Sequence, residues 1–295
     1  MHIETFFEAI SATFCYLVID ENTRKAAIID SVLGYDQYSG ICNTEFADKI
    51  IAYVLKHELK IEWILDTHIH ADHITAASYL KNKLGGKIAI GAEITKVLDL
   101  WIPIFDSESD TAFDGSQFDR LLEDNEVIEL GSLKVLVMHT PGHTPACASY
   151  LIKNAIFVGD TLFMPDVGTA RTDFPGGSAL EMYNSVRKIL SLPEDTKIYT
   201  CHDYPENGRV VSGVSTVKEQ ISSNIMINAG VSESEYVVMR NNRDKGKPVP
   251  KMLLPSIQTN LRAGGFGSKS ANGQRYIKIP VNNRLIVGDD FIFPY

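Results

Sequence analysis

The amino-acid sequence predicts an α/β (α+β) protein in which two mixed β-sheets pack face to face and helices cover their outer surfaces. Apolar runs of strand length follow one another in each half of the chain, and helical patterns are interleaved only about once per half. A doubly wound fold would alternate strands and helices more regularly. The hydrophobic content, 44% of 295 residues, is sufficient for a large core.

The first half of the chain begins with a predicted hairpin. Residues 13–19 and 26–29 are apolar, and Glu21-Asn22 between them is typical of a turn. The elements that we expect next are a helix capped by Thr44 with Phe46, Ile50, Tyr53 and Val54 on one face, a buried strand at 61–65, a helix from His73 to Gly85-Gly86, and a strand at 87–90.

The second half is richer in predicted strands. The expected elements are strands at 127–130, 133–138, 148–152 and 155–158, a helix at 180–190, and a strand at 197–200. Further along we expect helices at 214–225 and 232–243 and a basic, glycine-rich segment at 261–269. We therefore expect a main domain of residues 1–210 and a C-terminal helical and loop extension, residues 211–295, packed on the same domain.

Charge and cysteine content limit the classes of partner. The formal net charge is −9, whereas a general nucleic-acid-binding protein normally carries a basic stripe, so we expect no nucleic-acid partner. A small anionic substrate is compatible, because a pocket can be locally basic. We see no secretory signal and no apolar segment that could span a bilayer. Four cysteines without CxxC spacing indicate a reduced, cytoplasmic protein.

The segment 68–73 is the most informative part of the sequence. It carries His68, His70, Asp72 and His73 directly after the predicted strand at 61–65. Neutral imidazole offers a lone pair near pH 7, and so many polar groups inside a fold are costly unless a cation binds there. The alternative interpretation is a polar loop with coincidental histidines, and the downstream sequence argues against it.

Three further polar residues follow predicted strands in the same manner. They are His143 in the turn Pro141-Gly142-His143, Asp160 after the strand at 155–158, and His202 after the strand at 197–200. Strand ends project side chains onto one rim of a sheet, so residues far apart in sequence can converge there. Convergence of imidazoles and carboxylates predicts a metal site.

Other polar features are interpreted as structural. We assign His57 to a helix surface, His139 to a supporting position beside the metal site, and Cys201 to a buried thiol. The acidic stretch 106–124 lacks the turn glycine and the closing glutamate of a calcium loop. Residues 264–269 lack the spacing of a phosphate-binding loop, so we expect loops at both places.

The order of these motifs resembles that of the metallo-β-lactamase superfamily. The resemblance rests on the 68–73 segment, the Pro141-Gly142-His143 turn, Gly159-Asp160 and His202, and it covers residues 13–204. It implies a metallo-β-lactamase-like αββα sandwich of two mixed β-sheets with outer helices, with residues 1–210 as the catalytic domain. Hydrolysis, nuclease chemistry, oxygen reduction and sulfur oxidation all occur on this fold, so the fold alone does not specify the reaction.

Four segments resemble persulfide (sulfur) dioxygenases, and in particular the bacterial branch associated with sulfide detoxification. The segments are residues 67–75, Arg171-Thr172-Asp173-Phe174 within residues 164–177, residues 201–204 and residues 254–262. The resemblance implies one Fe(II) per chain held by His68, His143 and Asp160. Two histidines and one carboxylate form a facial triad that leaves positions open for sulfur and for O2. The implied reaction is oxidation of glutathione persulfide, or a similar low-molecular-weight persulfide, to sulfite and thiol.

Arg171 is the expected substrate anchor beside this site. Its guanidinium can bind a glutathione carboxylate in bidentate fashion. The alternative is that Arg171 pairs with Asp173 and shapes the loop. Asp173 is expected to order the same loop beside the reacting groups.

The residues His70, Asp72, His73 and His202 leave a second reaction open. In hydrolytic relatives such residues hold a second metal, and two zinc ions would activate a hydroxide for a glyoxalase-II-like hydrolysis of glutathione thioesters. In the dioxygenase interpretation they tune the metal ligands through hydrogen bonds. A non-catalytic metal-binding protein is a third alternative, which a complete ligand set disfavours. The resemblance alone also suggests a homodimer.

Overall fold

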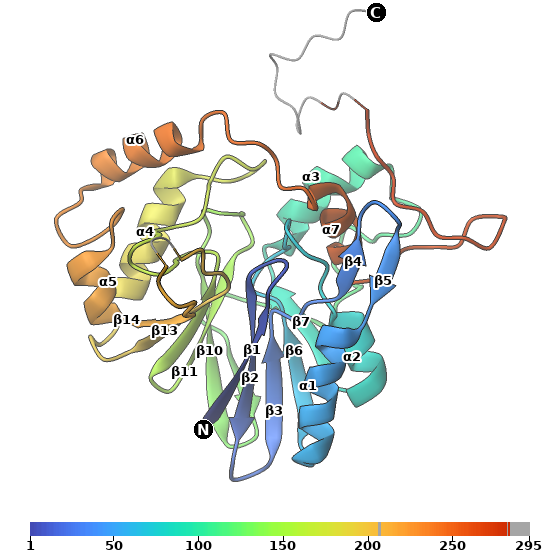
Figure 1. Cartoon of the computed structure of the whole chain (residues 1–295), viewed down its shortest axis with the longest axis horizontal. Coiled ribbons are helices and arrows are strands. Elements are labelled where there is room, and N and C mark those ends of the chain that lie inside the picture. Colours follow the sequence, from blue (N-terminus) through green and yellow to red (C-terminus); the bar gives the residue numbers. More distant parts are fainter. Residues whose placement is uncertain (206–207, 282, 284–295) are drawn as a thin grey trace, which may run out of the picture.

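The structure is a computed structural model that describes residues 1–205, 208–281 and 283. Two six-stranded sheets lie at its centre, and helices cover the outer surface of each sheet (Figure 1). Both sheets contain parallel and antiparallel pairs. The predicted sandwich of two mixed sheets with outer helices is therefore confirmed.

The first sheet is built from the N-terminal half of the chain. Its strands are, in spatial order, β1 (His2–Glu8), β2 (Thr13–Asp20), β3 (Lys25–Ile29), β6 (Lys60–Leu65), β7 (Lys87–Gly91) and β8 (Arg120–Leu122). The pairs β1–β2 and β2–β3 are antiparallel, and the remaining pairs are parallel. A separate hairpin consists of β4 (Gly34–Asp36) and β5 (Ile41–Asn43).

The second sheet is built from the following part of the chain. Its strands are, in spatial order, β14 (Val214–Thr216), β13 (Lys197–Thr200), β12 (Ala155–Gly159), β11 (Ala148–Ile152), β10 (Leu133–His139) and β9 (Val127–Leu130). Among the described strands of this sheet, the β12–β13 pair is parallel and the other pairs are antiparallel. Strands β6, β10, β12 and β13 each end directly before one of the predicted metal-ligand segments.

Strand β2 shows why the fold has four layers. All eight of its residues are buried. Because successive side chains of a strand point to opposite faces, Phe14 and Tyr16 enter the core between the two sheets. Cys15 and Leu17 enter a different core, beneath the helices that cover the first sheet. Burial on both faces explains the continuous apolar run that marks this strand in the sequence.

Helices form the two outer layers (Figure 1). Those over the first sheet are α1 (Glu45–Lys56), α2 (Ala77–Leu84) and α3 (Ile94–Phe105), and those over the second are α4 (Ala179–Leu190), α5 (Val217–Ser223) and α6 (Glu233–Asp244). The last helix, α7 (Leu253–Asn260), contacts α3, and α6 contacts α4. In the described part of the chain, none of these helices has the length and hydrophobicity needed to cross a membrane. The boundary between domains at residue 210 stays a prediction.

Two predicted helices begin later than expected, for identifiable reasons. Helix α2 begins at Ala77 rather than near His73, because Ile74 pairs with Leu33 and the Thr75 amide donates to the side chain of Asn260. The segment predicted as a helix at 214–225 begins with strand β14, which pairs with β13. The helix then begins after Thr216, whose side chain forms a capping box with Glu219.

Several elements were missed. They are β1, the β4–β5 hairpin, α3, β8 and α7. Helix α3 contains Pro103 in its last turn, where proline interrupts the helical pattern in the sequence. Thr44 precedes α1 as expected, but its hydroxyl donates to the carboxylate of Asp48 instead of accepting a backbone amide.

Asp20, at the end of β2, links the two sheets through hydrogen bonds. Its carboxylate accepts hydrogen bonds from the amide and hydroxyl of Ser132, at 2.6 and 2.9 Å, and from the hydroxyl of Thr23 at 2.6 Å. Because hydrogen bonds to a charged acceptor contribute about 1.5–3 kcal/mol, Asp20→Asn should lower the free energy of unfolding at pH 7 by about 2 kcal/mol.

The effect of this substitution should also depend on pH. The bonds from Ser132 and Thr23 hold the pKa of Asp20 well below its usual range. A depressed native-state pKa stabilises the fold above the unfolded value, near pH 3.9, and this stabilisation is lost as the pH falls. Urea unfolding of the wild type and Asp20→Asn should therefore differ most above pH 5 and converge in acid. A difference that stays constant from pH 7 to pH 3 would contradict this assignment.

Candidate metal centre

The predicted ligand segments meet at one edge of the two sheets. The segments follow the ends of β6, β10, β12 and β13. They place two groups of ligand atoms close together: His68, His143 and Asp160 in one group, and His70, Asp72, His73 and His202 in the other. Within each group, the ligand atoms lie no more than 4.8 Å apart. The structure thus brings together all seven residues that the sequence analysis proposed for the metal site.

Asp160 lies at the centre of the first group. Its Oδ2 atom is 3.8 Å from Nε2 of His68 and 3.7 Å from Nε2 of His143. Nitrogen and oxygen ligands bind metals at about 2.0–2.2 Å, so two ligands of one ion can lie up to about 4 Å apart. All three side chains are therefore within reach of a single ion.

The second group is joined to the first through His202. Nε2 of His202 lies 3.5 Å from Oδ1 of Asp160 and 3.3 Å from Oδ2 of Asp72. Nδ1 of His73 lies 3.2 Å from the same Asp72 oxygen. Asp160 thus faces both groups, as a carboxylate that bridges two ions would.

Hydrogen bonds fix the tautomer of each histidine in the first group. The hydroxyl of Thr67 donates to the buried carboxylate of Asp30, so its oxygen accepts from Nδ1 of His68 at 3.0 Å. Nδ1 of His143 lies 2.8 Å from the carbonyl of Arg171, which can only accept. Both rings therefore carry their proton on Nδ1 and present the lone pair of Nε2 toward Asp160.

In the second group the hydrogen bonds leave different nitrogens available. Nε2 of His70 donates to Asp30 at 3.1 Å, which leaves Nδ1 without a hydrogen-bond partner among the described residues. Nδ1 of His202 donates to the carbonyl of Ala12 at 3.1 Å, which leaves Nε2 free to accept. Supporting bonds of this kind orient metal-binding histidines and set their basicity.

Burial and neighbouring charges keep His68 and His70 neutral. Burial lowers the pKa of His68 well below its usual range, and His70 and His143 lower it further. Burial, followed by the charge of His73, lowers the pKa of His70 in the same direction. Neutral imidazole is the form that binds a metal, so these side chains need not lose a proton to bind one at pH 7.

The pKa values of the two carboxylates, Asp160 and Asp72, shift in opposite directions. Burial raises the pKa of Asp160, and the histidines His202 and His143 only partly offset that effect. Burial would also raise the pKa of Asp72, but His202 and His73 outweigh it and hold the pKa well below its usual range. A cation between these groups would favour the charged form of both carboxylates.

The orphaned polar atoms of the site fit a metal ion. Most of the buried side-chain atoms without a hydrogen-bond partner, among the described residues, belong to this cluster: His68 Nε2, His70 Nδ1, His73 Nε2, Asp160 Oδ1 and His202 Nε2. Buried polar atoms are normally paired, and each unpaired one costs about 1–3 kcal/mol. A cation with nitrogen and oxygen ligands would satisfy these atoms together.

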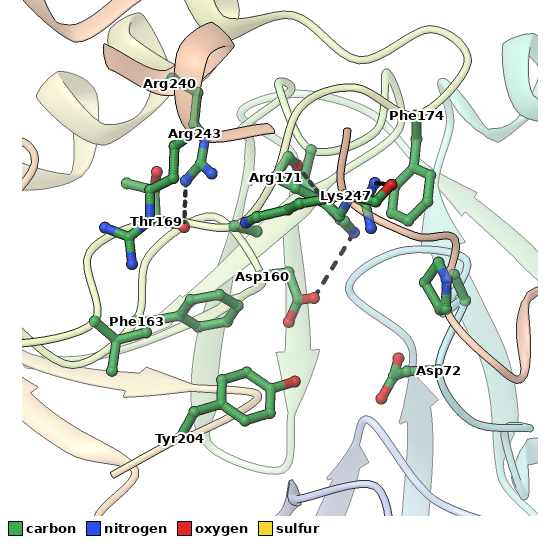
Figure 2. A pocket seen from close by; sticks show the side chains of 15 residues that line it. Asp72, Asp160, Phe163, Thr169, Arg171, Phe174, Tyr204, Arg240, Arg243 and Lys247 are labelled. Atoms are coloured by element: carbon green, nitrogen blue, oxygen red, sulfur yellow. Dashed lines mark hydrogen bonds and ion pairs between the residues drawn. The ribbon is translucent and has the colours of Figure 1, made fainter. Parts of the chain in front are cut away.

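A pocket of about 310 Å³ opens above the cluster. Its floor contains Asp72, His143 and Asp160, and one wall contains Phe163 and Tyr204 (Figure 2). In Figure 2, Lys247, Arg171 and Arg243 lie on the opposite side of Asp160 from Tyr204. The pocket is therefore acidic at the metal cluster and cationic along one side.

The guanidinium of Arg171 is bonded to other groups of the protein. Nε and Nη2 bond the carboxylate of Asp173 at 2.6 and 2.7 Å, and Nη1 bonds the carbonyl of Pro248 at 2.7 Å. The guanidinium also lies 4.8 Å from the ring centre of Phe174. This geometry matches the interpretation in which Arg171 shapes the loop, whereas its role as a substrate anchor stays a prediction.

Arg243 and Lys247 were missed by the sequence analysis. Both line the pocket from the C-terminal extension. In the described part of the chain, the guanidinium of Arg243 makes no hydrogen bond or ion pair, while Nζ of Lys247 lies 3.5 Å from Oδ1 of Asp244. Burial, followed by the charge of Arg240, lowers the pKa of Lys247. Charged residues at the end of a helix usually face solvent, so the position of these two side chains at the pocket could not be predicted from the sequence.

Asp30 was also missed, although its position in the sequence could have revealed it. It follows buried strand β3 directly, as Asp160 follows β12, and it supports both His68 and His70. Three residues that we interpreted from the sequence as structural have the following environments. His139 bonds the carbonyl of Leu122, and the ring of His57 stacks on that of Tyr53. Cys201 is buried, which raises the pKa of its thiol.

Comparison with known proteins places this chain in a family. The family model of the metallo-beta-lactamase superfamily matches residues 10–202. The chain belongs to this superfamily, and it is an enzyme of that fold with a metal-binding cluster. The resemblance recognised in the sequence is confirmed.

Individual relatives carry different names. A probable metallo-hydrolase of Burkholderia pseudomallei (strain 1710b) is 48% identical over 96% of this chain and 99% of that protein. Glyoxylase B2 of Dictyostelium discoideum is 51% identical over 95% of this chain and 97% of that protein. The mitochondrial persulfide dioxygenase ETHE1 of Homo sapiens is 31% identical over 89% of this chain and 88% of that protein.

A comparison with solved structures also finds a similar protein. The crystal structure of ETHE1 from Myxococcus xanthus superimposes with a TM-score of 0.71 at 29% identity, over 90% of this chain and the whole of that one. These matches establish the superfamily and the fold. The relatives' names include both a hydrolase and a dioxygenase, so the reaction of this chain has to be argued from its site.

Proposed function

We propose that this protein is a persulfide dioxygenase, which uses one Fe(II) ion to oxidise glutathione persulfide or a similar low-molecular-weight persulfide. The observation that carries the proposal is the group of His68, His143 and Asp160 at the floor of a pocket with a cationic side. The likeness to the persulfide dioxygenases named above supports it. The balanced reaction converts one persulfide, one O2 and one water into thiol, sulfite and two protons.

The residues of the site suit such a substrate. When bound, Fe(II) held by two histidines and one carboxylate supplies open coordination positions for sulfur and for O2. Phe163 and Tyr204 form an apolar wall, and the side of Arg243 and Lys247 offers positive charge. A persulfide with a carboxylate-bearing tail would place its sulfur near Asp160 and its tail near these cations.

An oxygen electrode combined with metal analysis tests the proposal. Apoprotein is loaded anaerobically with either one Fe(II) or two Zn(II) per chain, and each form receives glutathione persulfide or S-lactoylglutathione. We expect the iron form to consume about one O2 per persulfide and to release sulfite. If the iron form takes up no oxygen while the zinc form rapidly hydrolyses the thioester, the dioxygenase proposal is wrong.

The second group of ligands favours one alternative reaction. His70, Asp72, His73 and His202 could hold a second ion, with Asp160 between the two. A hydroxide between two zinc ions would attack a glutathione thioester, as in a glyoxalase-II-like hydrolase. The names of two relatives, a probable metallo-hydrolase and glyoxylase B2, are compatible with this alternative.

Substitution of the cations at the pocket should separate substrate binding from turnover. We expect Arg243→Ala/Lys247→Ala to raise the KM for an anionic persulfide about tenfold or more with little change in kcat, because charge-assisted hydrogen bonds contribute about 1.5–3 kcal/mol each. An uncharged alkyl persulfide serves as the control substrate, and its KM should not change. Equal effects on both substrates would contradict a role in carboxylate binding.

The same assay tests the sequence-based prediction for Arg171. Arg171→Ala should raise KM mainly for the anionic substrate if the guanidinium anchors a carboxylate. If it only shapes the loop through Asp173, kcat should fall for both substrates, because the Arg171 carbonyl holds His143. An unchanged KM would remove Arg171 as the anchor.

A further inference from the structure

The loop that carries the hydrogen-bond partner of His143 has little support of its own. Nδ1 of His143 bonds the carbonyl of Arg171, in a segment without helix or strand. In the described part of the chain, the backbone amides and carbonyls of residues 169–173 make no hydrogen bond to another backbone group. Their carbonyls and amides bond side chains instead. Whatever holds this loop therefore determines where the His143 ring points.

Helix α6 holds the loop on both sides of Arg171. Oδ2 of Asp244 accepts from the amide of Thr172 at 2.9 Å. Nη1 of Arg240 donates to the carbonyl of Thr169 at 2.9 Å, a contact that Figure 2 shows beside the pocket. These two bonds fix the backbone at Thr172 and at Thr169, on either side of the Arg171 carbonyl that accepts from His143.

The two α6 residues are paired with each other and deeply buried. Nε of Arg240 lies 2.8 Å from Oδ2 of Asp244, and Nη2 bonds the other oxygen. Arg240 is 1% exposed and Asp244 is 2% exposed. A buried ion pair costs desolvation energy, and a well-packed apolar pair is often equally stable or more stable. Stability alone therefore gives no reason for this pair, whereas its directed bonds to the loop do.

We propose that Arg240 and Asp244 are positioning residues for the metal ligand His143, acting through the loop from Thr169 to Thr172. Helix α6 lies outside residues 10–202, the part matched by the superfamily, so the C-terminal extension contributes to the geometry of the metal centre. The proposal requires only that the cluster binds a divalent metal, and it holds for oxygenase and hydrolase chemistry alike. Its test therefore measures metal binding without substrate.

Two variants test the proposal. Asp244→Asn removes the charge that pairs with Arg240 and weakens the hydrogen bond from the Thr172 amide. Arg240→Lys keeps a positive charge beside Asp244 but lacks the guanidinium nitrogen that bonds the carbonyl of Thr169. The control is Ile189→Ala, a buried apolar position in α4 whose side chain cannot hydrogen-bond the loop; the substitution should cost about 2–5 kcal/mol of stability.

The readouts are the affinity of apoprotein for Co(II), from competition with a chelator, and the visible spectrum of bound Co(II). We expect Asp244→Asn to weaken binding about tenfold to a hundredfold, as loss of a supporting contact to a metal ligand typically does, and to shift the spectrum. Arg240→Lys should show a smaller change in the same direction, and it decides the question if Asp244→Asn does not fold.

Ile189→Ala should lower the unfolding midpoint with wild-type affinity and spectrum. The proposal is overturned if the α6 variants bind Co(II) as the wild type does. It is also overturned if their loss of affinity is matched by Ile189→Ala at equal loss of stability. Failure of the dioxygenase assay would leave these outcomes unchanged, because no turnover is measured.

Discussion

Asp160→Asn should leave the protein folded, prevent stable metal binding and reduce kcat/KM by roughly 10³-fold or more. Oδ2 of Asp160 faces His68 and His143, and Oδ1 faces His202, so this carboxylate is shared by both groups of ligands. Asparagine keeps the shape but removes the negative charge that a cation requires. Loss of several kcal/mol of metal-dependent stabilisation corresponds to that reduction in rate.

The measurement is metal content per chain after dialysis, together with kcat/KM for both candidate substrates. Asp166→Asn is a matched control, because Asp166 is an exposed carboxylate that pairs with Arg209. The control should retain metal and activity. Because burial raises the pKa of Asp160, we expect Asp160→Asn without metal to unfold at the same or higher urea concentration than the wild-type apoprotein. Wild-type metal content in Asp160→Asn would refute the ligand role.

Gly142→Ala should destabilise the protein by about 3 kcal/mol or more and impair metal binding at the same time. Gly142 has φ +143°, a region that other residues rarely adopt, and it precedes His143. An added Cβ would lie 2.4 Å from Cα and 2.5 Å from N of Met182. These are backbone atoms of α4, so no side-chain rotation can relieve the contact, and the turn that carries His143 has to move.

Chemical unfolding and metal titration test this prediction. The control is Gly230→Ala, where the nearest atom to an added Cβ is the amide oxygen of Asn228 at 3.4 Å and φ is not positive. The control should change the free energy of unfolding by no more than about 0.5 kcal/mol. If Gly142→Ala unfolds at the same denaturant concentration as the wild type, the close approach of α4 does not constrain this turn.

The sequence predicted most strands of the sandwich because these strands are buried on one or both faces. Strand β2 reads as a continuous apolar run, since its two faces enter two different cores. The same pattern located the ligand segments, because His68, Asp160 and His202 each follow the end of a buried strand within three residues. Asp30 obeys the rule as well, and applying it to every strand would have found this residue.

Other parts of the site depend on contacts that no local pattern encodes. Lys247 reaches the pocket only because α6 packs on α4, far from it in sequence. The start of α2 is delayed because Asn260 bonds the Thr75 amide and the carbonyls of His70 and His73. The C-terminal extension therefore contributes to the pocket and supports the ligand segment 68–73, which a division of the chain at residue 210 does not suggest.

The number and position of the bound ions distinguish a single iron site from a two-metal site. Crystals of the anaerobically iron-loaded protein, measured on both sides of the iron absorption edge, give an anomalous difference map in which only iron appears. We expect one peak per chain, between His68, His143 and Asp160. Two peaks, with the second between Asp72, His73 and His202, or a single peak away from Asp160, would contradict this expectation.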